Sequence, residues 1–275
     1  MRKISKLLVV GLIVIGFLLP YSTLAVSQFC TDTGGTLTTG LVAYYNLNDG
    51  TDSWSTNNLT QTGSIANIPA KIGNGAVTTS TSAYYSILNN LGVVSSTTPY
   101  SISGWVKLTA EIGAGSYAFG SAGDATSDTG IELRYDYNAG TRRLQFDHYI
   151  QSQTTDATFY NVALGTANWN YLTITFSTST GIQGYLNGAL VATTSFTGTG
   201  GGVGHSTVSF VGGGNRSNGG TTADYVSNAI QDEFGFWNKT LSTTEITDLY
   251  NGGNGQTLQA SCASAVKRRY PIIIN

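Results

Sequence analysis

The chain has 275 residues, and only 10% of them are charged, well below the quarter that is usual for soluble domains. The formal net charge of −2 excludes the strongly charged composition of a disordered chain. Glycine is abundant, with 35 residues, and tyrosine is frequent, with 16. Threonine and tyrosine fit the pleated, half-buried surface of a strand, while glycine and asparagine fit turns. The composition therefore favours an all-β protein.

The first 25 residues have the pattern of a secretory signal peptide. Arg2, Lys3 and Lys6 precede the apolar run from Leu7 to Leu19, and Thr23-Leu24-Ala25 offers small residues at the positions that a signal peptidase reads. We expect cleavage after Ala25. An uncleaved membrane anchor is the alternative, but the run is shorter than the roughly 20 residues that span a bilayer. The sequence thus predicts a secreted or cell-surface protein with no membrane span after cleavage.

Cleavage would remove three basic residues and no acidic ones. The remainder keeps 10 of the 13 basic residues against 15 acidic ones, a net charge of −5. Nucleic-acid binding depends largely on basic residues that neutralise phosphates. We therefore expect no nucleic-acid partner.

Two cysteines remain, Cys30 and Cys262, near opposite ends of the exported chain. An even number of cysteines in an exported protein predicts a disulfide. Closing so long a loop would stabilise the fold by about 5 kcal/mol in the chain-entropy model. Two unpaired thiols are the alternative.

Strand patterns begin at Gly40 and continue through most of the chain. From Tyr100 to Leu108, and again around Leu172, Ile174 and Phe176, apolar and polar residues alternate with the period of a strand. Residues 26–39 are polar and are predicted to be a leader segment. We expect one domain over residues 40–258 and a C-terminal tail over residues 259–275.

Two local motifs are especially informative. Asn187-Gly188, between two strand-like runs, predicts a hairpin with a type I′ turn, because both residues accept left-handed backbone conformations. Ser242 and Glu245 have the spacing of a capping box and predict a helix that Asn251-Gly252-Gly253 ends. Together with the many short strands, these motifs predict an all-β sandwich or jelly roll with one short C-terminal helix.

Five regions, taken in order, carry a family resemblance. They are GLVAYYNLNDG (40–50) with DSWSTNNLT (52–60), AKIGNGAV (70–77), YSISGWVKL (100–108), NWNYLTITFSTSTGIQGYLNGALV (168–191) and IQDEFGFWNKTLSTTEITDLYNGG (230–253). The pattern resembles laminin-G-like domains of the concanavalin A-like lectin/glucanase superfamily. The resemblance implies a jelly roll of two antiparallel sheets, with the first and last long strands adjacent, which agrees with a Cys30–Cys262 disulfide. Such domains are mostly adhesive or carbohydrate-binding modules of secreted and surface proteins.

The same resemblance implies a structural calcium ion. Many relatives hold one between the loop after the first strand, where Asp49 and Asp52 lie here, and the closing strand, where Asp232 and Glu233 lie. Calcium binds several oxygen ligands, including carboxylates. We therefore predict Asp49, Asp52 and Asp232 as metal ligands, with solvated loop acids as the alternative.

No catalytic motif stands out. Laminarinase-type hydrolases share a strand with the pattern Glu-x-Asp-x-x-Glu, and none of the four glutamates here lies in such a pattern. No zinc-protease, nucleophile-elbow or phosphate-loop motif occurs either. We expect a non-catalytic module that recognises carbohydrate or another extracellular ligand. A structural or adhesive protein without a small ligand is the alternative, and a divergent glycoside hydrolase is a third.

A sugar-binding surface would use exposed aromatic rings. Trp54, Tyr84, Tyr85 and Tyr137 are the candidates for such rings, whereas Trp105, Trp169 and Trp237 are predicted to pack within the fold because they lie in strand patterns. The sequence does not choose a binding face.

Overall fold

Strands dominate the computed structural model, which describes residues 31–80, 82–89, 91–92, 97–124, 129–150, 153–196, 208–214, 222 and 225–259. The predicted signal peptide, Cys30, Cys262 and residues 260–275 of the tail lie outside the described residues. The predicted disulfide therefore stays a prediction. No helix among the described residues is long and apolar enough to cross a membrane.

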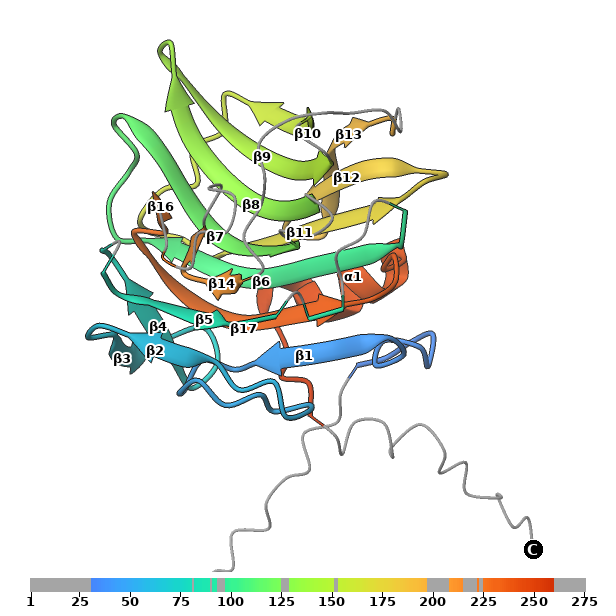
Figure 1. Cartoon of the computed structure of the whole chain (residues 1–275), viewed down its shortest axis with the longest axis horizontal. Coiled ribbons are helices and arrows are strands. Elements are labelled where there is room, and N and C mark those ends of the chain that lie inside the picture. Colours follow the sequence, from blue (N-terminus) through green and yellow to red (C-terminus); the bar gives the residue numbers. More distant parts are fainter. Residues whose placement is uncertain are drawn as a thin grey trace, which may run out of the picture.

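Two sheets form a sandwich (Figure 1). In spatial order, sheet A contains β13 (Ala189–Thr194), β12 (Gly181–Leu186), β11 (Asn170–Ser177), β6 (Tyr100–Leu108), β17 (Ala229–Trp237), β4 (Asn74–Thr78) and β3 (Ala66–Pro69), and β1 (Leu41–Tyr45) also pairs with β17. Sheet B contains β10 (Gln153–Tyr160), β9 (Thr141–Ile150), β8 (Thr129–Asn138), β7 (Gly115–Asp124), β14 (Ser209–Val211), β5 (Tyr84–Ile87) and β2 (Thr60–Thr62), with the short β15 (Gly213–Gly214) and β16 (Tyr225–Val226) beside β7. The described pairs are antiparallel except for the contact of β16 with β7.

The first strand lies beside the last, as the family resemblance implied. Leu41 pairs with Trp237 and Tyr45 with Phe234. Nearby, the Thr31 backbone N–H donates to the Gln256 side chain over 2.7 Å, and the Gln256 amide donates to the Thr31 carbonyl over 2.9 Å. The described part of residues 26–39 therefore packs against the end of the domain.

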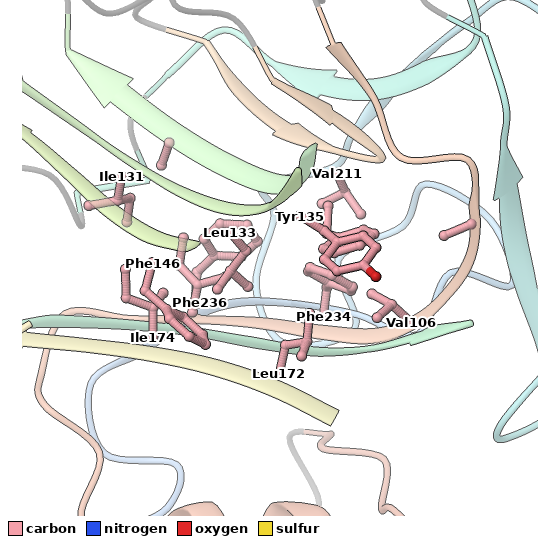
Figure 2. Packing of buried hydrophobic residues seen from close by; sticks show 14 of the residues in the cluster. Val106, Ile131, Leu133, Tyr135, Phe146, Leu172, Ile174, Val211, Phe234 and Phe236 are labelled. Carbon is pink, nitrogen blue, oxygen red and sulfur yellow. The ribbon is translucent and has the colours of Figure 1, made fainter. Parts of the chain in front are cut away.

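The core lies between the sheets and follows the predicted alternation. Val106 of β6 and Leu172 and Ile174 of β11 point toward sheet B, where they meet side chains such as Phe146 (Figure 2), and Ile102 of β6 belongs to the same cluster. These residues are fully buried. The alternate residues of β6 and β11 point to the outer face of sheet A.

A second apolar cluster covers that outer face. It joins Trp105 and Tyr171 of sheet A to Ile246 and Leu249 of α1 (Thr243–Tyr250) and to Leu37. The Ser242 side chain accepts from the Glu245 backbone N–H, and Glu245 binds back to the Ser242 backbone, so the predicted capping box is confirmed. The helix ends at Asn251, which has a left-handed backbone, and the 3₁₀ turn η1 (Asn251–Gly253) follows.

The predicted hairpin is also confirmed. β12 ends at Leu186 and β13 begins at Ala189, so Asn187 and Gly188 form the two-residue turn. Their φ angles are 52° and 80°, the left-handed values that a type I′ turn requires. The Asn187 backbone N–H donates to the Tyr171 carbonyl, which fixes the turn against the start of β11.

Candidate functional site

Two consecutive acidic residues, Asp232 and Glu233, are buried on the outer side of sheet A. Asp232 lies opposite Trp105 in the pairing of β17 with β6, and the register then shifts before Gly235. Glu233 occupies this bulge with φ of +55°, a left-handed conformation that costs energy for a residue with a Cβ. The bulge thus allows both carboxyl groups to be buried, with exposures of 0% and 2%.

Each of the two acids keeps one oxygen without a hydrogen-bond partner among the described residues. Asp232 Oδ2 accepts from the Ile72 backbone N–H over 2.7 Å, and Glu233 Oε1 accepts from the Thr257 hydroxyl over 2.6 Å. Asp232 Oδ1 and Glu233 Oε2 are buried without a well-formed hydrogen bond to a described donor, although the Lys71 backbone lies near Asp232 and the Tyr44 hydroxyl near Glu233. Burial raises the pKa of Asp232 to about 8, with a further contribution from Glu233, and burial raises the pKa of Glu233 to about 7.

Asp52, the second predicted metal ligand, stabilises its own loop. Its Oδ1 accepts from the Tyr44 and Trp54 backbone N–H groups over 3.0 and 2.9 Å. Its Oδ2 accepts from the Ser55 hydroxyl and the Asn57 backbone N–H. Asp52 is 5% exposed, and its protein donors leave little free coordination capacity.

Asp49, the third predicted ligand, is exposed and accepts from the Thr51 backbone N–H over 2.7 Å. Within the described parts of the chain, no group of three or more His, Cys, Asp or Glu residues could hold a metal ion. The three predicted aspartates therefore do not make a complete site by themselves. The unpartnered oxygens of Asp232 and Glu233 are the groups that best fit a hard cation, which would need backbone carbonyls or water as its other ligands.

A pocket of about 440 Å³ lies beside this acidic pair, on the same side of sheet A. It is lined by Lys71, Trp105, Ala167, Asn168, Trp169, Asn170, Asn187, Tyr250 and Gly253. Lys71 precedes Ile72, whose backbone binds Asp232, and the Trp105 ring stacks on the Tyr250 ring at 5.7 Å between centroids. The pocket thus combines rings with amide groups at one end of β6 and β11.

The structure confirms some of the predictions about aromatic side chains and contradicts others. Trp105 and Trp237 pack within the fold, as predicted, with exposures of 1% and 0%. Tyr84 and Tyr85 are buried at 3% and 4%, so their assignment to a sugar-binding surface was wrong. Both belong to β5, where Tyr84 packs against Phe210 and Tyr85 joins the core between the sheets.

Trp169 packs against the outer apolar cluster of sheet A, as predicted, but it is half-buried and also lines the pocket. The sequence did contain one usable signal, because Asn168 and Asn170 flank the ring at the start of β11 and amides next to an aromatic ring favour a polar ligand. The Asn187 turn completes the pocket only through the pairing of β11 with β12.

Sheet B carries a second set of buried charges on its outer face. Glu132 and Asp147 lie directly opposite each other in the pairing of β8 with β9, and both are fully buried. Arg134 Nε lies 3.2 Å from Asp147. A Cβ placed on Gly214 of β15 would lie 2.4 Å from Glu132 Oε1, so β15 sits tightly over this pair. These acids therefore lie beneath protein, away from any pocket described above.

Comparisons with known proteins agree with the architecture. A sequence model described as the Concanavalin A-like lectin/glucanases superfamily, of laminin-G type, matches residues 79–247. A search of curated proteins found no match.

One similar solved structure concerns cell entry of botulinum neurotoxin type C, which depends on interaction with two ganglioside molecules. It superposes on this chain with a TM-score of 0.58 at 14% sequence identity, over 78% of this chain and 52% of the other. The binding domain of botulinum neurotoxin DC in complex with rat synaptotagmin II gives a TM-score of 0.57 at 16% identity, over 78% and 52%. The binding domain of Paraclostridial Mosquitocidal Protein 1 gives 0.55 at 13% identity, over 79% and 53%.

These three chains are similar to the present one in fold, and the chain spans about half of their length. At such low identity, the likeness says nothing of shared ligands. The family match, in contrast, covers more than half of the chain and agrees with the two-sheet architecture. The chain therefore belongs to the laminin-G-like branch of the concanavalin A-like lectin/glucanase superfamily.

Proposed function

We propose that this chain is an exported, non-catalytic module that binds carbohydrate outside the cell. The observation that carries the proposal is the pocket on the outer side of sheet A, where two aromatic rings, Trp169 and Tyr250, lie among three asparagines. Sugar rings bind to such surfaces by stacking their apolar faces on aromatic rings and by exchanging hydrogen bonds with amides. The N-terminal signal-peptide pattern supports export.

The solved structures of similar fold give limited support. One is described by its interaction with gangliosides and another by a complex with synaptotagmin, so a carbohydrate and a protein ligand are both known among proteins that contain this fold. Because those chains are about twice as long as the matched part, their ligands could belong to either half. The pocket itself is thus the stronger argument for carbohydrate.

A glycoside hydrolase is the alternative that the structure makes more concrete. Glu132 and Asp147 are opposite each other, and directly opposed Cβ atoms in such pairs are about 4.5–5.5 Å apart, a spacing compatible with a carboxylate pair. However, both side chains are fully buried, and Arg134 already binds Asp147. A substrate could not reach Glu132 without displacing β15, so binding without catalysis is the better proposal.

Calcium and the disulfide are further proposals for this module. The two buried oxygens at Asp232 and Glu233 support a structural calcium ion. Asp49 and Asp52 remain proposed ligands from the family resemblance alone. The reciprocal hydrogen bonds between Thr31 and Gln256 support the disulfide, because Cys30 adjoins Thr31 and Cys262 follows Gln256 by six residues.

A glycan array probed with the chain lacking residues 1–25 tests the proposed function. We expect binding to a restricted set of saccharides, and we expect Trp169→Ala to abolish it while the melting temperature stays within a few degrees of the parent. Binding to no saccharide would favour the structural or adhesive alternative. New reducing ends after incubation with β-glucans, lost in Glu132→Gln, would instead favour the hydrolase.

A further inference from the structure

The pocket contains a single charged lining residue, Lys71. Lys71 lies in the loop between β3 and β4, and its ammonium group is 4.6 Å from the centroid of the Trp105 ring. It forms no ion pair with the described residues, whereas Arg134, Arg142, Arg143 and Lys239 each pair with an acid. None of the described residues that line the pocket is a carboxylate, so the positive charge of Lys71 is not neutralised by the lining. The pocket is thus locally positive in a chain whose net charge is negative.

The amides around Lys71 are oriented by the fold and keep unused hydrogen-bonding atoms. Asn187 Oδ1 accepts from the Tyr171 backbone N–H over 2.8 Å, so its Nδ2 remains as a donor without a described acceptor. Asn170 Nδ2 donates to the Leu164 carbonyl over 3.0 Å, so its Oδ1 remains as an acceptor without a described donor. The pocket therefore offers one fixed amide donor, one fixed amide acceptor and one cation.

We propose that this pocket selects saccharides that carry a carboxylate, as uronic acids do. This inference rests on the proposed carbohydrate-binding function and names the ligand class. The sugar face packs on Trp169 and Tyr250, its hydroxyl groups exchange hydrogen bonds with Asn170 and Asn187, and its carboxylate pairs with Lys71. The Lys71 ammonium group lies over the Trp105 ring, and it can exchange this contact for a charge-assisted hydrogen bond to the carboxylate.

The lining argues against other anions. A phosphate group or a highly sulfated polymer is bound by several basic residues, an arginine fork or a helix N-terminus, and the described lining has one lysine only. A single carboxylate matches a single ammonium group in charge. The volume of about 440 Å³ lies within the usual range for small-ligand pockets, so it suits one or two sugar residues rather than a long polymer segment.

Calorimetric titration with oligogalacturonate and with its methyl ester tests the inference, because esterification removes the charge and keeps the sugar. We expect the acid to bind at least about tenfold more tightly than the ester, because the acid alone can form a charge-assisted hydrogen bond with Lys71. Binding of the acid should weaken when salt is raised from about 0.05 to 0.5 M, since ions screen an exposed pair.

Variants locate the contact. Lys71→Met keeps an apolar stem and removes the charge, so it should bind acid and ester equally, while Lys71→Arg should keep the preference. Lys107→Met, on the neighbouring β6 but outside the pocket, is the matched control and should behave as the parent.

The outcomes separate the two proposals. Equal binding of acid and ester by the parent protein overturns the selectivity and leaves carbohydrate binding intact. A preference for the acid that survives in Lys71→Met places the acidic-sugar site elsewhere and overturns the assignment of the pocket. No binding of either form, together with an empty glycan array, overturns the proposed function as well.

Discussion

The two outer faces of the sandwich bury acidic side chains in opposite ways. On sheet B, two buried acids pair with arginines of the neighbouring strand: Asp147 with Arg134 at 3.2 Å, diagonally across β8 and β9, and Asp136 with Arg143 at 2.7 Å, directly opposite. On sheet A, Asp232 and Glu233 are equally buried, but their described partners are neutral donors, Ile72 and Thr257. Burying a charge is costly unless another charge or a metal compensates it. Sheet B thus pairs Asp136 and Asp147 with arginines, whereas the described partners of the two acids of sheet A carry no charge.

Removal of an arginine from sheet B should give the largest effect. Arg134→Met removes an ion pair from the fully buried Asp147, and we expect a loss of about 3–5 kcal/mol in the free energy of unfolding. Urea denaturation measures this loss. The control is Arg142→Met, whose partner Glu111 is partly exposed and whose loss should cost about 0–1 kcal/mol. Equal costs for the two variants would contradict the expected role of burial in the Arg134–Asp147 pair.

Calcium should stabilise sheet A and leave the sheet B network unaffected. At a concentration about a hundredfold above its dissociation constant, calcium would stabilise the native protein by about 2.7 kcal/mol. We expect the melting temperature to rise with calcium, to return with a chelator, and to become insensitive to calcium in Asp232→Asn. An unchanged midpoint in the parent protein would remove calcium from the proposal.

Asp49→Asn and Asp52→Asn refine the calcium experiment. Asp49 is exposed, so its variant should keep the native fold, and any loss of calcium response would report a direct role in binding. Asp52→Asn also weakens the loop, since Asp52 accepts from several loop donors. Its effect should therefore appear both with and without calcium.

Without metal, the acids of sheet A should make stability depend on pH. The folded-state pKa values of Asp232 and Glu233, about 8 and about 7, lie above their ordinary values, so the folded protein binds protons more tightly than the unfolded chain. Stability should then decline as pH rises from about 4 to 8, by up to about 1.4 kcal/mol for each unit by which a pKa is raised.

Thermal melting in chelator at several pH values measures this decline. Asp232→Asn imitates the protonated carboxyl and should flatten the profile, so that the variant exceeds the parent in stability at pH 8. A profile that rises with pH in the parent, or that keeps its slope in the variant, would show that other groups dominate.

The smallest expected effect comes from a change that touches neither set of acids. Ser242→Ala removes the N-cap of α1 and should cost about 1 kcal/mol in the free energy of unfolding. The calcium response and the pH profile should stay as in the parent protein. This variant is therefore a control: it shows whether a general loss of stability by itself changes the calcium response or the pH profile that we attribute to Asp232.

Local signals made much of the fold predictable from the sequence. Asn187-Gly188 specifies its turn through two left-handed residues, and Ser242 with Glu245 specifies a helix start through hydrogen bonds three residues apart. The alternation in β6 identifies which side chains enter the core, because successive strand residues point to opposite faces. These features depend on backbone conformation and short spacing, so they could be predicted without the tertiary structure.

The tertiary structure alone decided which polar residues meet. Asp147 meets Arg134 through the pairing of β8 with β9, and Asn187 joins Trp169 at one pocket through the pairing of β11 with β12. The bulge at Glu233 buries two successive acids where regular alternation would separate them. Such partnerships depend on the register between distant strands, and a shift of one residue would turn every side chain to the other face. The local patterns of the sequence thus determined a β-sandwich, and long-range pairing decided where its charges and its pocket lie.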